Sequence, residues 1–124
     1  MRTFIVDDSE VLRSRLVQML SEIKGIEIVG EAGFVRDAVR EIKKLNPDIA
    51  ILDMKMADGS GIDILTSLKK ENMATRTIIF TNYPYLQYRK KCLDAGADFF
   101  FYKATELGKL MDLLRGLLLR QKKS

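Results

Sequence analysis

Residues 48–56 read DIAILDMKM, and this stretch decides the fold. Its first half, from Ile49 to Leu52, is apolar without interruption and leads directly into Asp53. A strand that is apolar on both faces is typical of the interior of a parallel sheet, where helices cover both sides. The stretch therefore predicts a central parallel strand that ends in a carboxylate.

Similar short apolar runs lie on both sides of this strand, and segments with the apolar spacing of helices separate them. Strands that alternate with helices form right-handed crossovers and hence a parallel sheet. We therefore predict an α/β fold, a single doubly wound (βα)5 three-layer sandwich with the flavodoxin-like strand order 2-1-3-4-5. The predicted strands are residues 3–6, 27–29, 49–52, 77–80 and 99–102.

Capping and turn residues predict several helix ends. Ser9 is placed to cap the first helix, and Gly25 lies just past the expected end of that helix. The fourth helix is predicted to begin near Pro84, a good first-turn residue, and to stop at Gly96. Thr105 is the predicted cap of the fifth helix.

The composition is that of one ordinary globular domain, with 124 residues, of which 47% are apolar and 31% are charged. The formal net charge is +4, but Arg120, Lys122 and Lys123 carry three of these charges in an acid-free tail. We therefore predict one domain over residues 1–119 and a basic tail over residues 120–124. The other basic residues are scattered among acids, which argues against direct nucleic-acid binding by this domain.

Other classes of protein are disfavoured by residues that the chain lacks. Cys92 is the only cysteine and there is no histidine, which excludes a disulfide framework and a Cys/His zinc site within this chain. No apolar run has the length of a membrane span, and the start does not resemble a secretory signal. The sequence therefore predicts a cytoplasmic protein with no membrane association.

Polar side chains follow four of the predicted strands at the point where each strand ends. Taken one at a time, each is explained as a turn residue, a helix cap or a solvated side chain. Parallel strands of a doubly wound sheet, however, bring their carboxyl ends to one edge, where ligands bind. We therefore expect one site that contains Asp7, Asp8, Asp53, Thr81 and Lys103.

Three carboxylates at one edge repel each other unless a cation joins them. Mg²⁺ fits this composition, because it takes oxygen ligands, usually one or two carboxylates with water and substrate phosphate. Asp8 and Asp53 are the predicted direct ligands, and Asp7 is a candidate for contact through water. The backbone carbonyl of Lys55, two residues beyond Asp53, is the fourth candidate.

A carboxylate beside Mg²⁺ can attack phosphorus to form an acyl phosphate. Asp53 is the predicted nucleophile, since it ends the central strand. Charge then develops on the transferred oxygens, so Lys103 is expected to supply a positive charge and Thr81 a hydroxyl donor. No general base is needed, in keeping with the absence of histidine.

In order and spacing, these pieces resemble the receiver domain of bacterial response regulators along the whole chain. The resemblance implies a two-component phosphorelay switch, not an enzyme beyond slow self-dephosphorylation, that receives phosphate from a histidine kinase or a phosphotransfer protein. It also implies that Asp53 is the acceptor, that Asp7 and Asp8 serve the metal, and that Lys103 contacts the phosphate. The matching segments are residues 5–8 (IVDD), 48–56, 58–61 (DGSG), Thr81, 95–98 (AGAD) and Lys103.

The resemblance further implies a switch in which the Thr81 hydroxyl turns toward the phosphoryl group and the Phe100 ring swings inward. Phe100 is explained equally well as an apolar residue of an edge strand. The expected output is a protein partner on the face of the fourth helix, fifth strand and fifth helix. Leu113 and Leu119 lie off the main apolar stripe of the fifth helix and suggest a homodimer.

Some positions depart from the family pattern. Ala57 and Ala104 stand where the family commonly has proline, and Asn82 stands where a small residue is common. An aspartyl phosphatase is disfavoured, since Lys55 replaces the acid that its signature requires, and glycine-rich nucleotide motifs are absent. Two alternatives stay open: a degenerate receiver that binds partners without phosphorylation, and a receiver cut from a longer regulator.

Overall fold

β3 (Ile49–Leu52), the strand predicted from the decisive stretch, lies at the centre of a parallel sheet and is buried at every residue. The computed structural model describes residues 1–83 and 85–123. The other strands of this sheet are β1 (Arg2–Val6), β2 (Glu27–Ala32), β6 (Arg76–Thr81) and β7 (Phe99–Tyr102). Their order, β2-β1-β3-β6-β7, is the predicted order of five parallel strands, so the fold class is confirmed.

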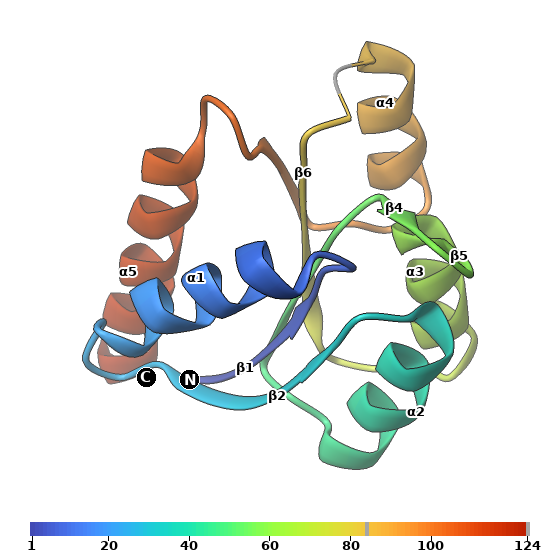
Figure 1. The fold of residues 1–124 in the computed structure, drawn as a ribbon. Coiled ribbons are helices and arrows are strands. Elements are labelled where there is room, and N and C mark those ends of the chain that lie inside the picture. Colours follow the sequence, from blue (N-terminus) through green and yellow to red (C-terminus); the bar gives the residue numbers. More distant parts are fainter. Residues whose placement is uncertain (84, 124) are drawn as a thin grey trace.

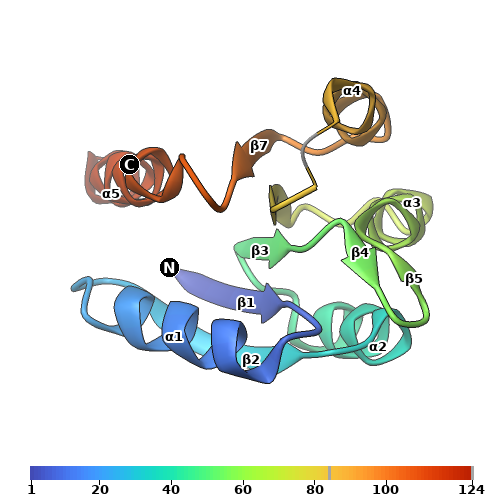
Figure 2. The same ribbon diagram turned by 45° about the horizontal axis from the view of Figure 1, so that its top comes forward.

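Helices cover both faces of the sheet and complete the three layers. They are α1 (Glu10–Ser21), α2 (Val35–Leu45), α3 (Gly61–Lys70), α4 (Leu86–Asp94) and α5 (Leu107–Lys123). α1 and α5 pack on one face, and α2, α3 and α4 pack on the other (Figure 1). Figure 2 shows β7 at the edge of the sheet between α4 and α5.

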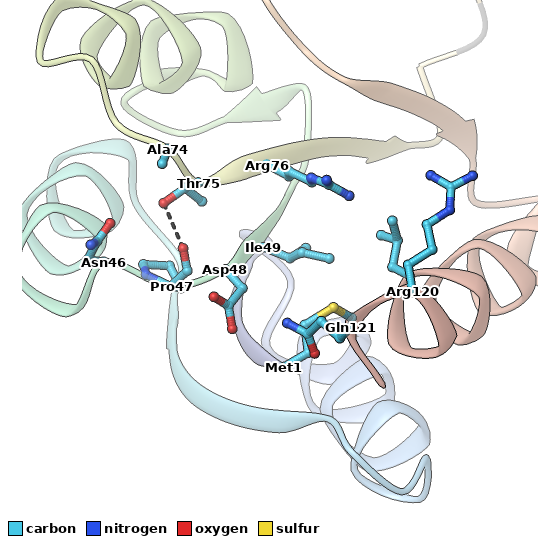
Figure 3. Close-up of a pocket in the computed structure, with 11 residues that line it drawn as sticks. Met1, Asn46, Pro47, Asp48, Ile49, Ala74, Thr75, Arg76, Arg120 and Gln121 are labelled. Atoms are coloured by element: carbon cyan, nitrogen blue, oxygen red, sulfur yellow. Dashed lines mark hydrogen bonds between the residues drawn. The ribbon is translucent and has the colours of Figure 1, made fainter. Parts of the chain in front are cut away.

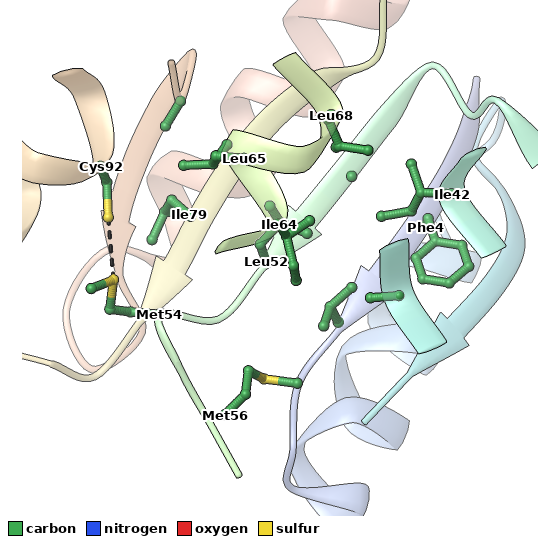
Figure 4. Close-up of a cluster of buried hydrophobic side chains, with 14 of the residues drawn as sticks. Phe4, Ile42, Leu52, Met54, Met56, Ile64, Leu65, Leu68, Ile79 and Cys92 are labelled. Atoms are coloured by element: carbon green, nitrogen blue, oxygen red, sulfur yellow. Dashed lines mark hydrogen bonds between the residues drawn. The ribbon is translucent and has the colours of Figure 1, made fainter. Parts of the chain in front are cut away.

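Alternate residues of each strand point to opposite faces, so one strand feeds two hydrophobic cores. Phe4 of β1 packs with Ile42 in the core beneath α2, α3 and α4 (Figure 4). Ile5, the next residue, packs with Leu20 and Leu110 in the core beneath α1 and α5. Each such side chain contributes about 1.5–3 kcal/mol when it is fully buried, so both faces hold β1 in place.

The predicted helix ends are confirmed in part. The Ser9 hydroxyl accepts a hydrogen bond from the Leu12 N–H at 3.3 Å and caps α1. α1 ends at Ser21, earlier than predicted, and Gly25 instead serves the following turn at φ 100°. Gly96, at φ 108°, follows the end of α4, as predicted.

The predicted starts of the last two helices differ from the structure. α4 begins at Leu86, and the predicted start at Pro84 lies outside the described residues. The predicted cap Thr105 is wrong, because α5 begins at Leu107 and Glu106 precedes it. The Glu106 carboxylate accepts the N–H of Tyr102 at 3.0 Å, which draws the end of β7 against the start of α5.

A short hairpin between Asp53 and α3 was not predicted. It pairs β4 (Lys55–Met56) with β5 (Gly59–Ser60) in antiparallel fashion. Its two-residue turn is formed by Ala57 and Asp58, and two-residue turns are the commonest connections of hairpins. The Asp58 carboxylate accepts the N–H groups of Val35 at 2.7 Å and Arg36 at 3.1 Å. Asp58 thus caps α2, whose own cap residue, Phe34, has no such side chain.

The carboxyl end of the chain continues as helix. α5 runs to Lys123, past the predicted domain end at residue 119. The division into a domain over residues 1–119 and a tail over residues 120–124 stays a prediction. Among the described helices, none is both long enough and apolar enough to cross a membrane.

Gly61 begins α3 against the backbone of Asp53. A Cβ atom at residue 61 would lie 2.5 Å from the Asp53 carbonyl oxygen and 3.1 Å from the Ile79 side chain. We expect Gly61→Ala to lower the free energy of unfolding by about 1–3 kcal/mol, the usual cost of overpacking. Gly116→Ala is the matched control, since a Cβ there meets nothing within 4 Å and should stabilise α5 by about 1 kcal/mol. Urea denaturation measures both changes, and equal midpoints for Gly61→Ala and wild type would contradict the close approach.

Asp58 makes part of the stability depend on pH. Its hydrogen bond from the Val35 N–H, above all, lowers the pKa of the carboxyl below its ordinary value of 3.8. Because the folded-state pKa is lowered, the stability that the Asp58 carboxylate contributes is fully present above the ordinary pKa. This stability is lost as the pH falls through the folded-state pKa. We expect Asp58→Asn to be less stable than wild type at neutral pH, and this difference to shrink on acidification.

Urea midpoints at about pH 7 and about pH 3 test this expectation. Asp112→Asn is the control, since its carboxylate is largely exposed on α5 and makes only a long ion pair, at 3.8 Å, with Arg115. The same pH dependence in the Asp58 and Asp112 variants would show that Asp58 does not cap α2.

Candidate functional site

The sheet brings the three predicted carboxylates together. Asp7 and Asp8 follow β1, and Asp53 follows the neighbouring strand β3. One oxygen from each carboxylate lies within 4.8 Å of the others. Asp7 and Asp53 are buried, with exposed fractions of 3% and 8%, whereas Asp8 is exposed. The cluster therefore opens to solvent on the side of Asp8.

Lys103, which follows β7, reaches the same cluster. Its ammonium donates hydrogen bonds to Asp53 Oδ2 at 2.9 Å and to Asp7 Oδ2. Burial alone lowers the pKa of Lys103, but its hydrogen bond to Asp7 and the charge of Asp53 outweigh this effect, so the pKa is raised. Lys103 therefore stays protonated and joins β1, β3 and β7 at their carboxyl ends.

Backbone N–H groups orient the two buried carboxylates. Asp53 Oδ1 accepts the N–H of Met54 at 2.7 Å, and Asp7 Oδ1 accepts the N–H of Ser9 at 2.9 Å. In both residues the second oxygen, Oδ2, faces Lys103. Each carboxylate thus has one fixed oxygen and one oxygen directed into the site.

Thr81 completes the set of predicted side chains. It ends β6, is buried, and its hydroxyl accepts the N–H of Tyr83 at 3.2 Å. All five predicted side chains line one cavity of about 390 Å³. Lys55 also lines this cavity, but its backbone carbonyl as a metal ligand stays a prediction.

The donor set fits a hard divalent cation. Carboxylate oxygens are the ligands that Mg²⁺ prefers, and this cluster offers three of them from Asp7, Asp8 and Asp53. The single ammonium of Lys103 does not balance three carboxylates, so the site retains negative charge. The acidic cluster could therefore hold a metal ion.

Phe100 lies in the core, apart from the carboxylates. Its ring is 3% exposed and packs edge-on against Tyr102, with centroids 5.1 Å apart. The Arg89 guanidinium of α4 lies 5.6 Å from the ring centroid. This position fits the interpretation of Phe100 as an apolar strand residue, and its role as a switch stays a prediction.

A group of three packed tyrosines, of which Tyr83 lines the cavity, was not predicted. Tyr83 packs edge-on against Tyr85 and Tyr88, with ring centroids 5.5 and 4.8 Å away. The Lys55 ammonium lies 5.7 Å from the centroid of the Tyr83 ring. The close spacing of the three tyrosines in the sequence was the signal that could have predicted this group. Their packing against one another could not be predicted, because it depends on tertiary structure.

Ala104 does not disturb the position of Lys103. Among the described residues no peptide bond is cis, including the one between Lys103 and Ala104. This agrees with the cost of a cis bond before a residue other than proline, about 2.5–4 kcal/mol. The Lys103 N–H bonds the Thr81 carbonyl at 2.9 Å, which continues the pairing of β6 and β7 up to the site.

Comparisons with known sequences give one consistent result. A family model described as the response regulator receiver domain matches residues 3–115. The DNA-binding transcriptional activator DevR/DosR of Mycobacterium tuberculosis is 34% identical over 116 residues, which are 94% of this chain and 52% of that protein. The response regulator protein VraR of Staphylococcus epidermidis is 29% identical over 92% of this chain and 54% of its own length. The chain thus spans about half the length of these relatives.

Solved structures give the same result. The signal receiver domain of a putative Luxo repressor protein from Vibrio parahaemolyticus is 28% identical, with a TM-score of 0.82 over 98% of this chain and 92% of that one. The CheX-CheY-BeF3-Mg complex of Borrelia burgdorferi contains a chain that is 28% identical, with a TM-score of 0.79. That match covers 92% of this chain and 89% of the other.

Mg²⁺ binding should stabilise the protein through the acidic cluster. A ligand that binds only the folded state adds about 2.7 kcal/mol when its free concentration is about 100 times Kd. We expect MgCl2 to raise the melting temperature of wild type, and Asp8→Asn to remove most of this increase, because Asp8 is the exposed member of the cluster. Asp94→Asn on α4 is the control, and equal increases in all three proteins would indicate that the cation binds elsewhere.

Proposed function

The chain belongs to the response regulator receiver domains of two-component systems, and on that premise we propose that Asp53 accepts the phosphoryl group. The observation that carries this proposal is the orientation of the Asp53 carboxylate. One oxygen is bonded to the Met54 N–H, and the other is directed to Lys103 at 2.9 Å. Asp7 is oriented in the same way, but Asp53 ends the central strand and lies between the acids of β1 and the polar ends of β6 and β7.

Asp8 and Asp53 would hold Mg²⁺ directly, with Asp7 as the third acidic member and the Lys55 carbonyl as a backbone ligand. Bound there, the ion would neutralise the carboxylates and the oxygens of an incoming phosphate. The exposed position of Asp8 suits an exchangeable ion that enters from solvent.

The proposed reaction uses side chains of this chain as nucleophile and as stabilisers of negative charge. An oxygen of Asp53 attacks phosphorus, the bond from phosphorus to a histidine nitrogen of the donor breaks, and an aspartyl phosphate forms. The donor histidine keeps the electron pair of the broken bond. Lys103 stabilises the negative charge on the transferred oxygens, and Thr81 donates its hydroxyl hydrogen to one of them.

This chemistry makes the domain a switch. The Thr81 hydroxyl is bonded to the N–H of Tyr83, so a turn toward the phosphoryl group would release the segment that leads into α4. The buried Phe100 ring lies 5.6 Å from the Arg89 guanidinium of α4, so a movement of this ring would affect the same helix. We assign Thr81 and Phe100 to the switch on these contacts.

The proposed partners are proteins. A histidine kinase or a phosphotransfer protein donates phosphate, and a downstream target binds the face formed by α4, β7 and α5. Exposed Leu86 on α4 and Leu119 near the end of α5 leave apolar surface for such a target or for a homodimer. The proposed location is the cytoplasm, and the proposal includes no direct binding of nucleic acid by this domain.

Phosphorylation of Asp53 is tested by intact mass after incubation with Mg²⁺ and acetyl phosphate. We expect one phosphate-sized gain in wild type, no gain in Asp53→Asn, and no gain when Mg²⁺ is chelated. Asp94→Asn, an acid of α4 outside the site, is the matched control and should be phosphorylated like wild type.

A gain that persists in Asp53→Asn would place the acceptor elsewhere. If no protein gained mass with acetyl phosphate or with a cognate kinase, the proposal would be wrong. The alternative, a receiver that binds partners without phosphorylation, would then be favoured.

A further inference from the structure

A second polar cavity lies at the opposite end of the strands from the acidic cluster, where the strands begin (Figure 3). Its volume is about 430 Å³, within the range of small-molecule sites. It is lined by the start of the chain, the turn between α2 and β3, the segment that enters β6, and the last turns of α5. None of its lining residues belongs to the phosphoacceptor site.

Arginines give this cavity an excess of positive charge. Arg76 at the start of β6 and Arg120 near the end of α5 both line it, and both are exposed. Within residues 1–83 and 85–123, neither guanidinium has an ion-pair or hydrogen-bond partner. Among the described residues that line the cavity, Asp48 is the one acid, and its carboxylate accepts the N–H of Arg2 at 2.7 Å.

Hydrogen bonds between separate segments fix the floor of the cavity. The Thr75 hydroxyl donates to the Pro47 carbonyl at 2.8 Å, a bond drawn in Figure 3. The Arg76 N–H donates to the Asp48 carbonyl at 3.0 Å. Next to the cavity lining, the Arg2 guanidinium donates to the Leu45 carbonyl at 2.6 Å. A ligand would therefore meet a formed floor and would not have to order the backbone on binding.

We propose that this cavity binds a small dianion through Arg76 and Arg120. A guanidinium presents two parallel N–H donors that match the oxygens of a phosphate or carboxylate group. Two guanidiniums from different elements at one cavity favour a ligand with two negative charges over a single monoanion. The site differs from the Asp53 cluster in position and in charge, so it does not depend on the proposed phosphorylation.

The test is an amide NMR titration with inorganic phosphate, at a pH where it is a dianion, and, separately, with the dicarboxylate succinate. It uses the full chain without Mg²⁺ and at constant ionic strength. We expect saturable shifts at residues 46–49, 74–76 and 117–121, and the stronger of the two probes identifies phosphate or carboxylate as the preferred group. In the double variant Arg76→Gln/Arg120→Gln the affinity should fall by about tenfold or more, a loss of about 1.4 kcal/mol.

Arg15→Gln/Arg36→Gln is the matched control, since it removes the same charge at exposed positions outside the cavity. It should bind like wild type. Equal weakening in both double variants, shifts that rise linearly without saturation, or shifts confined to the surroundings of Lys103 would each overturn the proposal. Arg120→Gln alone, near the end of α5, gives a second measurement if the change at β6 disturbs the fold.

Discussion

The contact of Lys103 with Asp7 and Asp53 is the interaction on which the site depends. Two carboxylates whose oxygens lie within 4.8 Å of each other repel by about 3 kcal/mol or more at the effective dielectric constant of partly buried groups. The fold tolerates this repulsion because one ammonium bonds both carboxylates and ties β1, β3 and β7 together at their ends. The negative charge that remains would be neutralised by a divalent cation, which the acidic cluster could hold.

The sheet turns this electrostatic constraint into fixed geometry. The N–H of Asp7 bonds the Ala32 carbonyl at 3.1 Å, and the N–H of Asp53 bonds the Val6 carbonyl at 3.0 Å, so strand pairing continues into the acidic residues themselves. Beneath Asp53, the Met54 side chain packs in the core, and the Cys92 thiol contacts its sulfur at 3.3 Å (Figure 4). The carboxylates therefore have little freedom to move apart, and repulsion cannot be relieved by backbone movement at low cost.

The fold and the residues of the site could be predicted because they depend on short stretches of sequence. Apolar runs mark the strands, and the residue after each run falls at a common edge, so Asp7, Asp53, Thr81 and Lys103 could be grouped before any contact was known. The features that were missed depend on partners distant in sequence. Asp58 caps α2 only because the β4–β5 hairpin folds back on it, and Gly61 is required only because Asp53 lies against it. Glu106 replaces Thr105 before α5 because it bonds the end of β7.

On the proposed function, α4 is the element best suited to report a change at Thr81. α3 buries Ile64, Leu65 and Leu68, whereas Cys92 is the fully buried residue among those of α4. Leu86 and Leu93, which would anchor a typical amphipathic helix, are 76% and 39% exposed. Since each buried side chain contributes about 1.5–3 kcal/mol, α4 is held to the sheet more weakly than α3. If Thr81 forms a new hydrogen bond, it releases the Tyr83 N–H at the start of the segment before α4. Because α4 is weakly packed, this local change can shift the helix and so alter the surface that a partner binds.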